Sequence, residues 1–292
     1  MKKLLVIIVL AAAVFSVIAA CKKTNPIPFS TADITGGAAT NTPTTAGTAA
    51  PTNTPTTGGA ATNTPTQTSI AKTASFDDMS DCDNANKWGG YWYTYDDGES
   101  CPGGAGTCGT STVWPASARA VPGSTFTMSS PGHAGAPDCA ARLTGVVTKL
   151  NSPNFQYGFI AMGAQVDPGS GSPTYVYYDF SAFETTGGIS FWTMGDGKPY
   201  AIKLKAVSSV PVGDASYEYN FTAPATWTQV TVYFGGTNTP KFAQPSWAPP
   251  ANIVPVAQVL AKITDIQFQT VNQPHTSIDL WIDDMTFVGC TF

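Results

Sequence analysis

Residues 263–269 read Ile-Thr-Asp-Ile-Gln-Phe-Gln, a run in which apolar Ile266 and Phe268 alternate with the amides Gln267 and Gln269. Successive side chains of a β-strand point to opposite faces of its sheet, so this pattern predicts a strand with one buried and one polar face. The segment is therefore expected to lie in a sheet that covers a hydrophobic core.

The same period of two recurs along the chain beyond Ser75, where short alternating runs are separated by turn residues. Such spacing is typical of an all-β sandwich or barrel. Only residues 254–262 suit a helix, of one or two turns. We expect about ten strands, at residues 91–95, 140–146, 155–162, 175–180, 189–193, 200–206, 217–221, 228–234, 263–269 and 278–287.

The alternation also assigns faces. In residues 189–193 the core set is Ile189 and Phe191, which leaves Trp192 on the other face. Residues 91–95 read Tyr-Trp-Tyr-Thr-Tyr and place aromatic rings on both faces, of which only one can be core. We assign Trp92 to the core and the tyrosines to the outside.

The N-terminus has the parts of an export signal: a basic Met1-Lys2-Lys3, an apolar stretch over residues 4–20, and Cys21 preceded by two alanines. This ending resembles the lipobox of bacterial lipoproteins, which implies cleavage before Cys21, acylation of its thiol and a stable anchor. The alternative is an ordinary signal peptide or a membrane helix, but the apolar stretch is short for a span of about 20 residues. Lys22, instead of Asp, follows the cysteine, and by resemblance to the lipoprotein sorting rule this implies the outer membrane in a two-membrane bacterium. The expected location is therefore the cell envelope, at the outer membrane or cell surface.

Residues 21–74 follow as a segment of Thr, Pro, Ala, Gly and Asn, in which Asn-Thr-Pro-Thr occurs three times. Too few apolar side chains are present to build a core, so we expect a disordered tether. As a flexible coil it would span roughly 40 Å root-mean-square. The predicted organisation is a signal peptide over residues 1–20, a lipidated tether over 21–74 and one β-domain over 75–292.

The charge of the expected domain excludes some partners. From Ser75 onward the sequence has nine Lys and Arg residues against eighteen Asp and Glu residues. Nucleic acids and anionic lipids need a basic surface, so we expect neither as a partner. Contact with a membrane is expected through the lipid anchor alone. A protein partner is an alternative that the charge does not exclude.

Six motifs follow one another along residues 75–288: Ser75-Phe76-Asp77-Asp78 and those at residues 88–98, 140–145, 188–192, 227–230 and 281–287. In this order they resemble the motifs of family-11-like carbohydrate-binding modules and related galactose-binding-like jelly rolls of bacterial surface proteins. The resemblance covers essentially the whole expected domain. It implies a jelly-roll β-sandwich with a concave face and often a structural calcium ion.

The resemblance further implies that the tyrosines of residues 91–95 approach the concave face, where aromatic rings take sugar C–H faces and amides satisfy hydroxyls. Trp247 could form a rim, and Asp96 and Asp97 would accept from paired hydroxyls. We therefore expect a polysaccharide partner, a neutral glucan-like chain. The candidate carbohydrate-binding residues are Tyr91, Tyr93, Tyr95, Trp192, Gln267, Gln269 and Trp247.

Four carboxylates are candidate ligands of the calcium ion, because the terminal strands of such jelly rolls pair and would bring them together. Carboxylate oxygens select Ca²⁺ over zinc. The alternative is that some point to solvent and the others cap turns. The four candidates are Asp77, Asp78, Asp283 and Asp284.

Five cysteines remain after Cys21, an odd number that leaves at least one unpaired. Export favours disulfides, and the glycine-rich loop between Cys101 and Cys108 could close on itself. Cys82 and Cys139 are a second candidate pair that rests on no sequence argument.

No nucleophile elbow, phosphate loop or zinc-binding HExxH motif is present in the sequence, and it has two histidines, so we do not expect an enzyme. Carbohydrate binding is the leading interpretation. The alternatives are a structural or adhesive envelope protein that uses the β-sandwich for protein contacts, and a glycoside hydrolase with a carboxylate pair.

Overall fold

The computed structural model describes residues 72–98, 109–116, 126–148, 158–167, 176–271 and 274–292. The chain divides into two units, residues 1–63 and 64–292, and all described residues belong to the second unit. The expected signal peptide, the lipidation site at Cys21 and the Cys101–Cys108 pair lie outside the described residues. In the described part no helix is long and apolar enough to cross a membrane.

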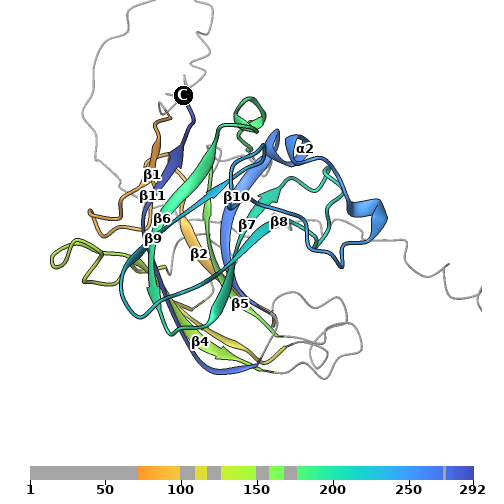
Figure 1. Cartoon of the computed structure of the whole chain (residues 1–292). Helices are drawn as coiled ribbons and strands as arrows, with labels where there is room; N and C mark the ends of the chain where they lie inside the picture. Colours follow the sequence, from red (N-terminus) through yellow and green to blue (C-terminus); the bar gives the residue numbers. More distant parts are fainter. Residues whose placement is uncertain (1–71, 99–108, 117–125, 149–157, 168–175, 272–273) are drawn as a thin grey trace, which may run out of the picture. The chain divides into compact units, whose positions relative to one another are not determined.

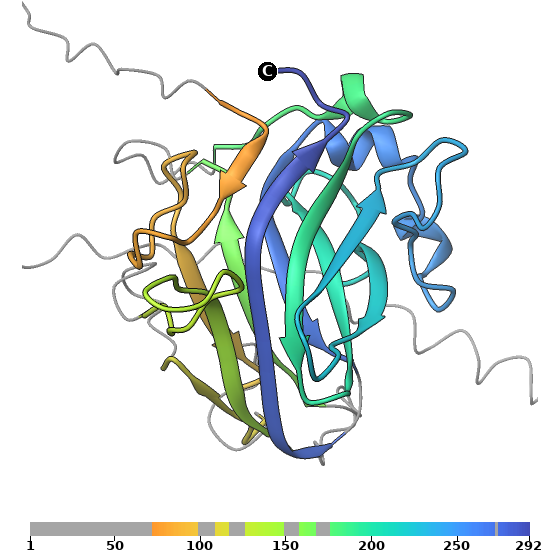
Figure 2. The same ribbon diagram turned by 60° about the vertical axis from the view of Figure 1, so that its left-hand side comes forward.

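The described residues form a sandwich of two antiparallel sheets (Figure 1). The first sheet has six strands in the order β3-β4-β11-β6-β9, and β1 pairs with the far end of β11. Figure 2 shows β11 running between β4 and β6, with β1 beside its upper end. The strands are β1 (Ser75–Asp77), β3 (Thr112–Trp114), β4 (Ala141–Val147), β6 (Gly188–Gly195), β9 (Thr228–Tyr233) and β11 (His275–Val288).

The second sheet has five strands in the order β2-β5-β10-β7-β8. Its central strand contains the run of residues 263–269 with which the sequence analysis began. The strands are β2 (Trp92–Asp96), β5 (Ile160–Gln165), β7 (Pro199–Ala206), β8 (Tyr217–Thr222) and β10 (Ile263–Thr270).

The hydrophobic core lies between the two sheets and is built by the inward side chains that the alternation assigned. Phe268 of β10 contacts Phe191 of β6 across the sandwich, with ring centroids 5.2 Å apart. Trp92 is fully buried beside Phe268, which confirms its assignment to the core. Its indole nitrogen donates a hydrogen bond of 2.7 Å to Asp77, so the buried polar edge of the ring is satisfied.

Three helical turns complete the described elements: η1 (Ser181–Phe183), η2 (Pro250–Asn252) and α2 (Val256–Leu260). The helix expected within residues 254–262 is confirmed as α2. The strand expected at residues 175–180 is wrong for the part that is described, because Tyr178 makes one isolated bridge to Ile263 and η1 follows. Two strands of three residues, β1 and β3, were missed because they are too short to display a period of two.

Candidate functional site

The outer face of the five-stranded sheet carries side chains in rows that run from strand to strand. Residues paired in register share a face, so each row lies on one side of the sheet. Gln267 belongs to the middle row, Gln269 to the row on one side and Asp265 to the row on the other. The rows are Tyr93-Gly163-Gln267-Lys203-Glu218, Tyr95-Ala161-Gln269-Ala201-Asn220 and Gln165-Asp265-Lys205.

A hydrogen-bonded network joins the first and third strands of this sheet. The Tyr95 hydroxyl donates to Gln267 Oε1 at 2.7 Å, and Gln267 Nε2 donates to the Tyr93 hydroxyl at 2.7 Å. The Tyr93 hydroxyl donates to Asp265 Oδ1 at 3.0 Å. Both ends of the Gln267 amide are used, so its orientation is fixed. The two half-buried tyrosine rings lie 6.0 Å apart at an angle of 34°.

Gly163 explains how Tyr93 reaches across the intervening strand β5. A Cβ at this position would lie 2.8 Å from the Tyr93 hydroxyl oxygen and 3.0 Å from Gln267 Cγ. Any larger residue would displace the network, so glycine lets the Tyr93 ring lie against the sheet. Ala161 occupies the corresponding position beside Tyr95.

The charges of this face are largely compensated. Lys203 pairs with Glu218 at 3.5 Å. Burial raises the pKa of Asp265, and burial together with the positive charge of Lys203 lowers the pKa of Lys205. Burial also raises the pKa of both Tyr93 and Tyr95, so their hydroxyls stay protonated at neutral pH. The face thus offers hydrogen-bond donors and acceptors with little excess charge.

A cavity of about 460 Å³ adjoins the row of Asp265 and Lys205. Its walls are the end of β7, the loop that connects β7 to β8, and the start of β10. No sequence pattern predicts this cavity, because its lining depends on how the β7–β8 loop folds back beside the sheet. The lining residues with polar side chains are Lys205, Ser208, Asp214, Ser216, Thr264 and Asp265.

The structure brings Tyr93, Tyr95, Gln267 and Gln269 together on one face, as expected, but it places Trp192 and Trp247 elsewhere. Trp192 lies on β6 in the six-stranded sheet, next to the inward-pointing Phe191, and therefore on the opposite outer surface. The alternation predicted that Trp192 points outward, but the expectation that it joins the tyrosines is wrong. Alternation cannot tell which of two sheets a strand joins.

Tyr91 precedes β2 and makes an isolated bridge to Ala85, with 40% of its surface exposed. Trp247 is 57% exposed in the loop before η2. That loop follows Ala243, which bridges to Glu218 on β8, at the opposite edge of the sheet from the tyrosines of β2. Asp97 is buried and accepts hydrogen bonds from Ser111 and from the Phe159 backbone, so it is an internal acceptor.

The outer surface of the six-stranded sheet carries a second aromatic group, which sequence reasoning did not find as a cluster. The rings of His133 and Trp192 stack with centroids 3.9 Å apart. Trp227 meets both His133 and Trp281 edge-on. The Arg142 guanidinium lies 4.4 Å from the Trp281 ring centre and forms a bidentate pair with Asp279.

The four carboxylates expected to bind calcium lie near the paired strands β1 and β11 but have separate partners. Asp77 accepts from the Trp92 indole and the Met79 backbone, and Asp78 pairs with Lys87. Asp283 accepts from the backbone nitrogens of His133 and Asp284, each at 2.7 Å. Asp284 contacts His133 Nδ1 at 3.0 Å.

Burial raises the pKa of Asp77 to about 6 and that of Asp283 to about 7. Within the described part of the chain, no three His, Cys, Asp or Glu side chains form a group that could hold a metal ion. The four carboxylates as a set therefore do not fit a calcium ion. Calcium binding stays a prediction, and a thermal melt with and without a chelator tests it.

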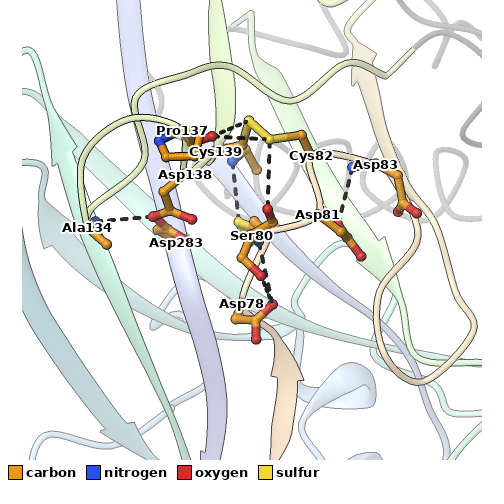
Figure 3. The surroundings of a disulfide bond; sticks show 12 residues. Asp78, Ser80, Asp81, Cys82, Asp83, Ala134, Pro137, Asp138, Cys139 and Asp283 are labelled. Carbon is orange, nitrogen blue, oxygen red and sulfur yellow. Dashed lines mark hydrogen bonds between the residues drawn. A yellow bond between two sulfur atoms is a disulfide. The ribbon is translucent and has the colours of Figure 1, made fainter.

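Cys82 and Cys139 form a disulfide with Cα atoms 5.3 Å apart, which confirms the second candidate pair. It links the turn after β1 to the segment before β4, and Figure 3 shows Asp81 and Asp83 on one side of it and Asp138 and Asp283 on the other. Cys290 is a free cysteine among the residues that the structure describes.

The fold is similar to that of family 11 carbohydrate-binding modules. One is the module of the cellulosomal cellulase Lic26A-Cel5E of Clostridium thermocellum, with 15% identity, coverage of 74% of this chain and 94% of that chain, and a TM-score of 0.40. A second is a family 11 module from Clostridium thermocellum in complex with a β-1,3-1,4-mixed-linked tetrasaccharide, with 16% identity, coverage of 69% and 96%, and a TM-score of 0.36.

An exo-β-agarase is also similar, with 13% identity, a TM-score of 0.36, and coverage of 57% of this chain and 22% of the agarase. No family model and no curated protein matches the sequence. At these identities and TM-scores the similarity describes the fold alone, so the function is inferred from this chain's own residues.

Proposed function

We propose that the protein binds a neutral polysaccharide on the outer face of its five-stranded sheet. The observation that supports this most is the network of Tyr93, Tyr95, Gln267 and Asp265, which fixes two aromatic rings beside an amide and a carboxylate. A sugar ring offers apolar C–H faces to aromatic rings and hydroxyls to amides and carboxylates, and both kinds of partner occur here side by side.

The neutral character of the ligand follows from the charges of the face. Lys203 is paired with Glu218, and Lys205 stands opposite Asp265 on the neighbouring strand. An anionic polymer would find each lysine already next to a carboxylate, whereas hydroxyls can donate to the carboxylates and accept from the ammonium groups. Binding is expected to be weak, because the hydroxyls must be desolvated and are imperfectly paired.

We also propose that the protein works at the cell surface, held by acylation of Cys21 and extended by the tether. This part rests on the sequence of the N-terminus. A lipid anchor with a flexible segment of this length would let the domain reach polymer beyond the membrane surface.

The experiment is electrophoresis of the domain through gels that contain mixed-linkage β-glucan. Tyr95→Ala removes an aromatic ring and the donor to Gln267, and we expect it to lose most of the retardation. Trp114→Ala is the matched control, because this tryptophan is 47% exposed on the opposite sheet. It should keep wild-type retardation. Equal retardation of both variants, each with a wild-type circular dichroism spectrum, would contradict this site.

A second candidate function is contact with another protein through the opposite sheet. The surface around Trp192, Trp227, Trp281 and Arg142 has the residue types that dominate protein interfaces. A pull-down with the wild-type domain and with Arg142→Ala tests this candidate. It is supported if one envelope protein is captured by the wild type and lost by the variant.

A further inference from the structure

The cavity beside Asp265 lies where the polar strip along β10 ends. Gln269, Gln267 and Asp265 follow one another on the outer side of β10, over about 13 Å at the usual rise per residue. The next residue toward the cavity, Thr264, lines it together with Asp265. A sugar chain that lies along β10, between the tyrosines of β2 and the lysines of β7, therefore leads into the cavity.

The far wall of the cavity is the loop between β7 and β8. Val210 and Val212 of this loop are buried, and backbone hydrogen bonds join Val210 to Val207, Val212 to Val210 and Ala215 to Val212 at 2.8–3.0 Å. Gly213 turns the loop with a φ of 50°. Because the wall is held by its own core contacts, the cavity is preformed, as sites for small ligands usually are.

Three charged side chains line the cavity, those of Lys205, Asp214 and Asp265. Lys205 Nζ donates to the buried Ser216 hydroxyl at 3.3 Å and forms no ion pair within 4.0 Å in the described residues. An ammonium group has three donors, so more than one remains for a ligand. The Asp265 carboxylate accepts from Tyr93 and has further lone pairs. A donor and an acceptor on neighbouring strands suit adjacent hydroxyls of one sugar.

We propose that this cavity seats the terminal sugar residue of a neutral polysaccharide, so that the protein recognises chain ends instead of internal segments. The proposal rests on the proposed function of the adjoining face. The volume of about 460 Å³ lies in the lower part of the range of about 300–1,000 Å³ for small-molecule sites, which suits one sugar residue or a few. Residues 207–214 of the β7–β8 loop contribute most of its lining.

Calorimetric titration of the domain with mixed-linkage β-glucan tests the proposal. Intact glucan is compared with the same mass of glucan that an endoglucanase has cut to a known number of chain ends. Recognition of ends predicts that the binding sites per gram rise in proportion to the ends. An unchanged number of sites per gram would overturn end recognition and keep the proposed function. No binding of either sample by the wild type would overturn both.

Two lysine variants test whether the glucan fragments bind in the cavity. Lys205→Met removes the ammonium group from the cavity and should weaken binding of the glucan fragments at least tenfold. Lys262→Met is the matched control, since Lys262 donates to Ser209 of the same loop at 3.1 Å and does not line the cavity. It should bind like the wild type. Wild-type affinity of a folded Lys205→Met variant would overturn the proposal.

Discussion

The hydroxyl of Tyr93 on β2 donates a hydrogen bond of 3.0 Å to the carboxylate of Asp265 on β10, 172 residues further along the chain. Strand β5 lies between the two, so the bond spans three neighbouring strands. It gives the half-buried carboxylate a donor and holds the Tyr93 ring against the sheet. The candidate site therefore depends on a contact between distant parts of the sequence.

Tyr93→Phe keeps the ring and removes this donor. Asp265 then loses one partner and Gln267 Nε2 loses its acceptor, so we expect the free energy of unfolding to fall by about 1–3 kcal/mol. Urea denaturation measures the free energy of unfolding. The slope of this free energy against urea concentration should not change. Tyr177→Phe, at a tyrosine that is 48% exposed, should be neutral. Equal stability of both variants would show that the network contributes nothing.

Stability should fall as the pH rises from about 4 to 8. Burial raises the pKa of Asp77 to about 6 and that of Asp283 to about 7, above the usual value of 3.8. The folded state thus holds these protons more tightly, which stabilises it below about pH 4, and this stabilisation is lost as the pH passes 7. The lowered pKa values of Asp78 and Asp196 act only at more acid pH, and the pKa of His275, which burial lowers, opposes the fall only near its usual value of 6.5.

Urea denaturation at pH 5 and at pH 8 checks the pH dependence. Asp283→Asn removes the carboxyl with the higher of the two raised pKa values, so the free energy of unfolding should differ less between pH 5 and pH 8 in this variant. If the variant shows the same difference as the wild type, another group causes it.

Loss of the Cys82–Cys139 disulfide should destabilise the domain strongly. The bond joins residues 57 apart, and the entropy of closing such a loop corresponds to about 4 kcal/mol. The double variant Cys82→Ser with Cys139→Ser should therefore show a much lower melting temperature by calorimetry. Cys290→Ser, at the free cysteine, is the control and should melt within a few degrees of the wild type. A double variant as stable as this control would contradict the estimate.

Cys21→Ser should release the protein from membranes into the soluble fraction, because the acylated thiol is the expected anchor. Fractionation of the full-length protein, followed by mass spectrometry of its N-terminal peptide, makes the measurement. The N-terminal peptide should have the added mass of the lipid in the wild type and lack it in the variant. A variant that stays with membranes after washing would show that another segment anchors it.

Some of these features could be predicted from local patterns. The period of two located nine of the strands and put Trp92 and Phe268 inside and the tyrosines and Gln267 outside, because face alternation follows from backbone geometry alone. The same pattern failed for Trp192, whose strand joins the other sheet. It also failed to show that the four expected calcium ligands have separate partners, since side-chain partners depend on loops such as the one that carries His133.

Neighbouring residues and composition were sufficient for the class of the fold, the core face of each long strand and the acidic balance of the domain, and they predict an export signal and a tether. Which strands are neighbours depends on tertiary packing. That order places Tyr93, Gly163 and Gln267 in one row, stacks Trp192 on His133 on the opposite surface, and sets the β7–β8 loop beside Asp265 to form the cavity. The physical reason is that strand order is set by packing and pairing between segments far apart in the chain, and local periodicity contains no information about them.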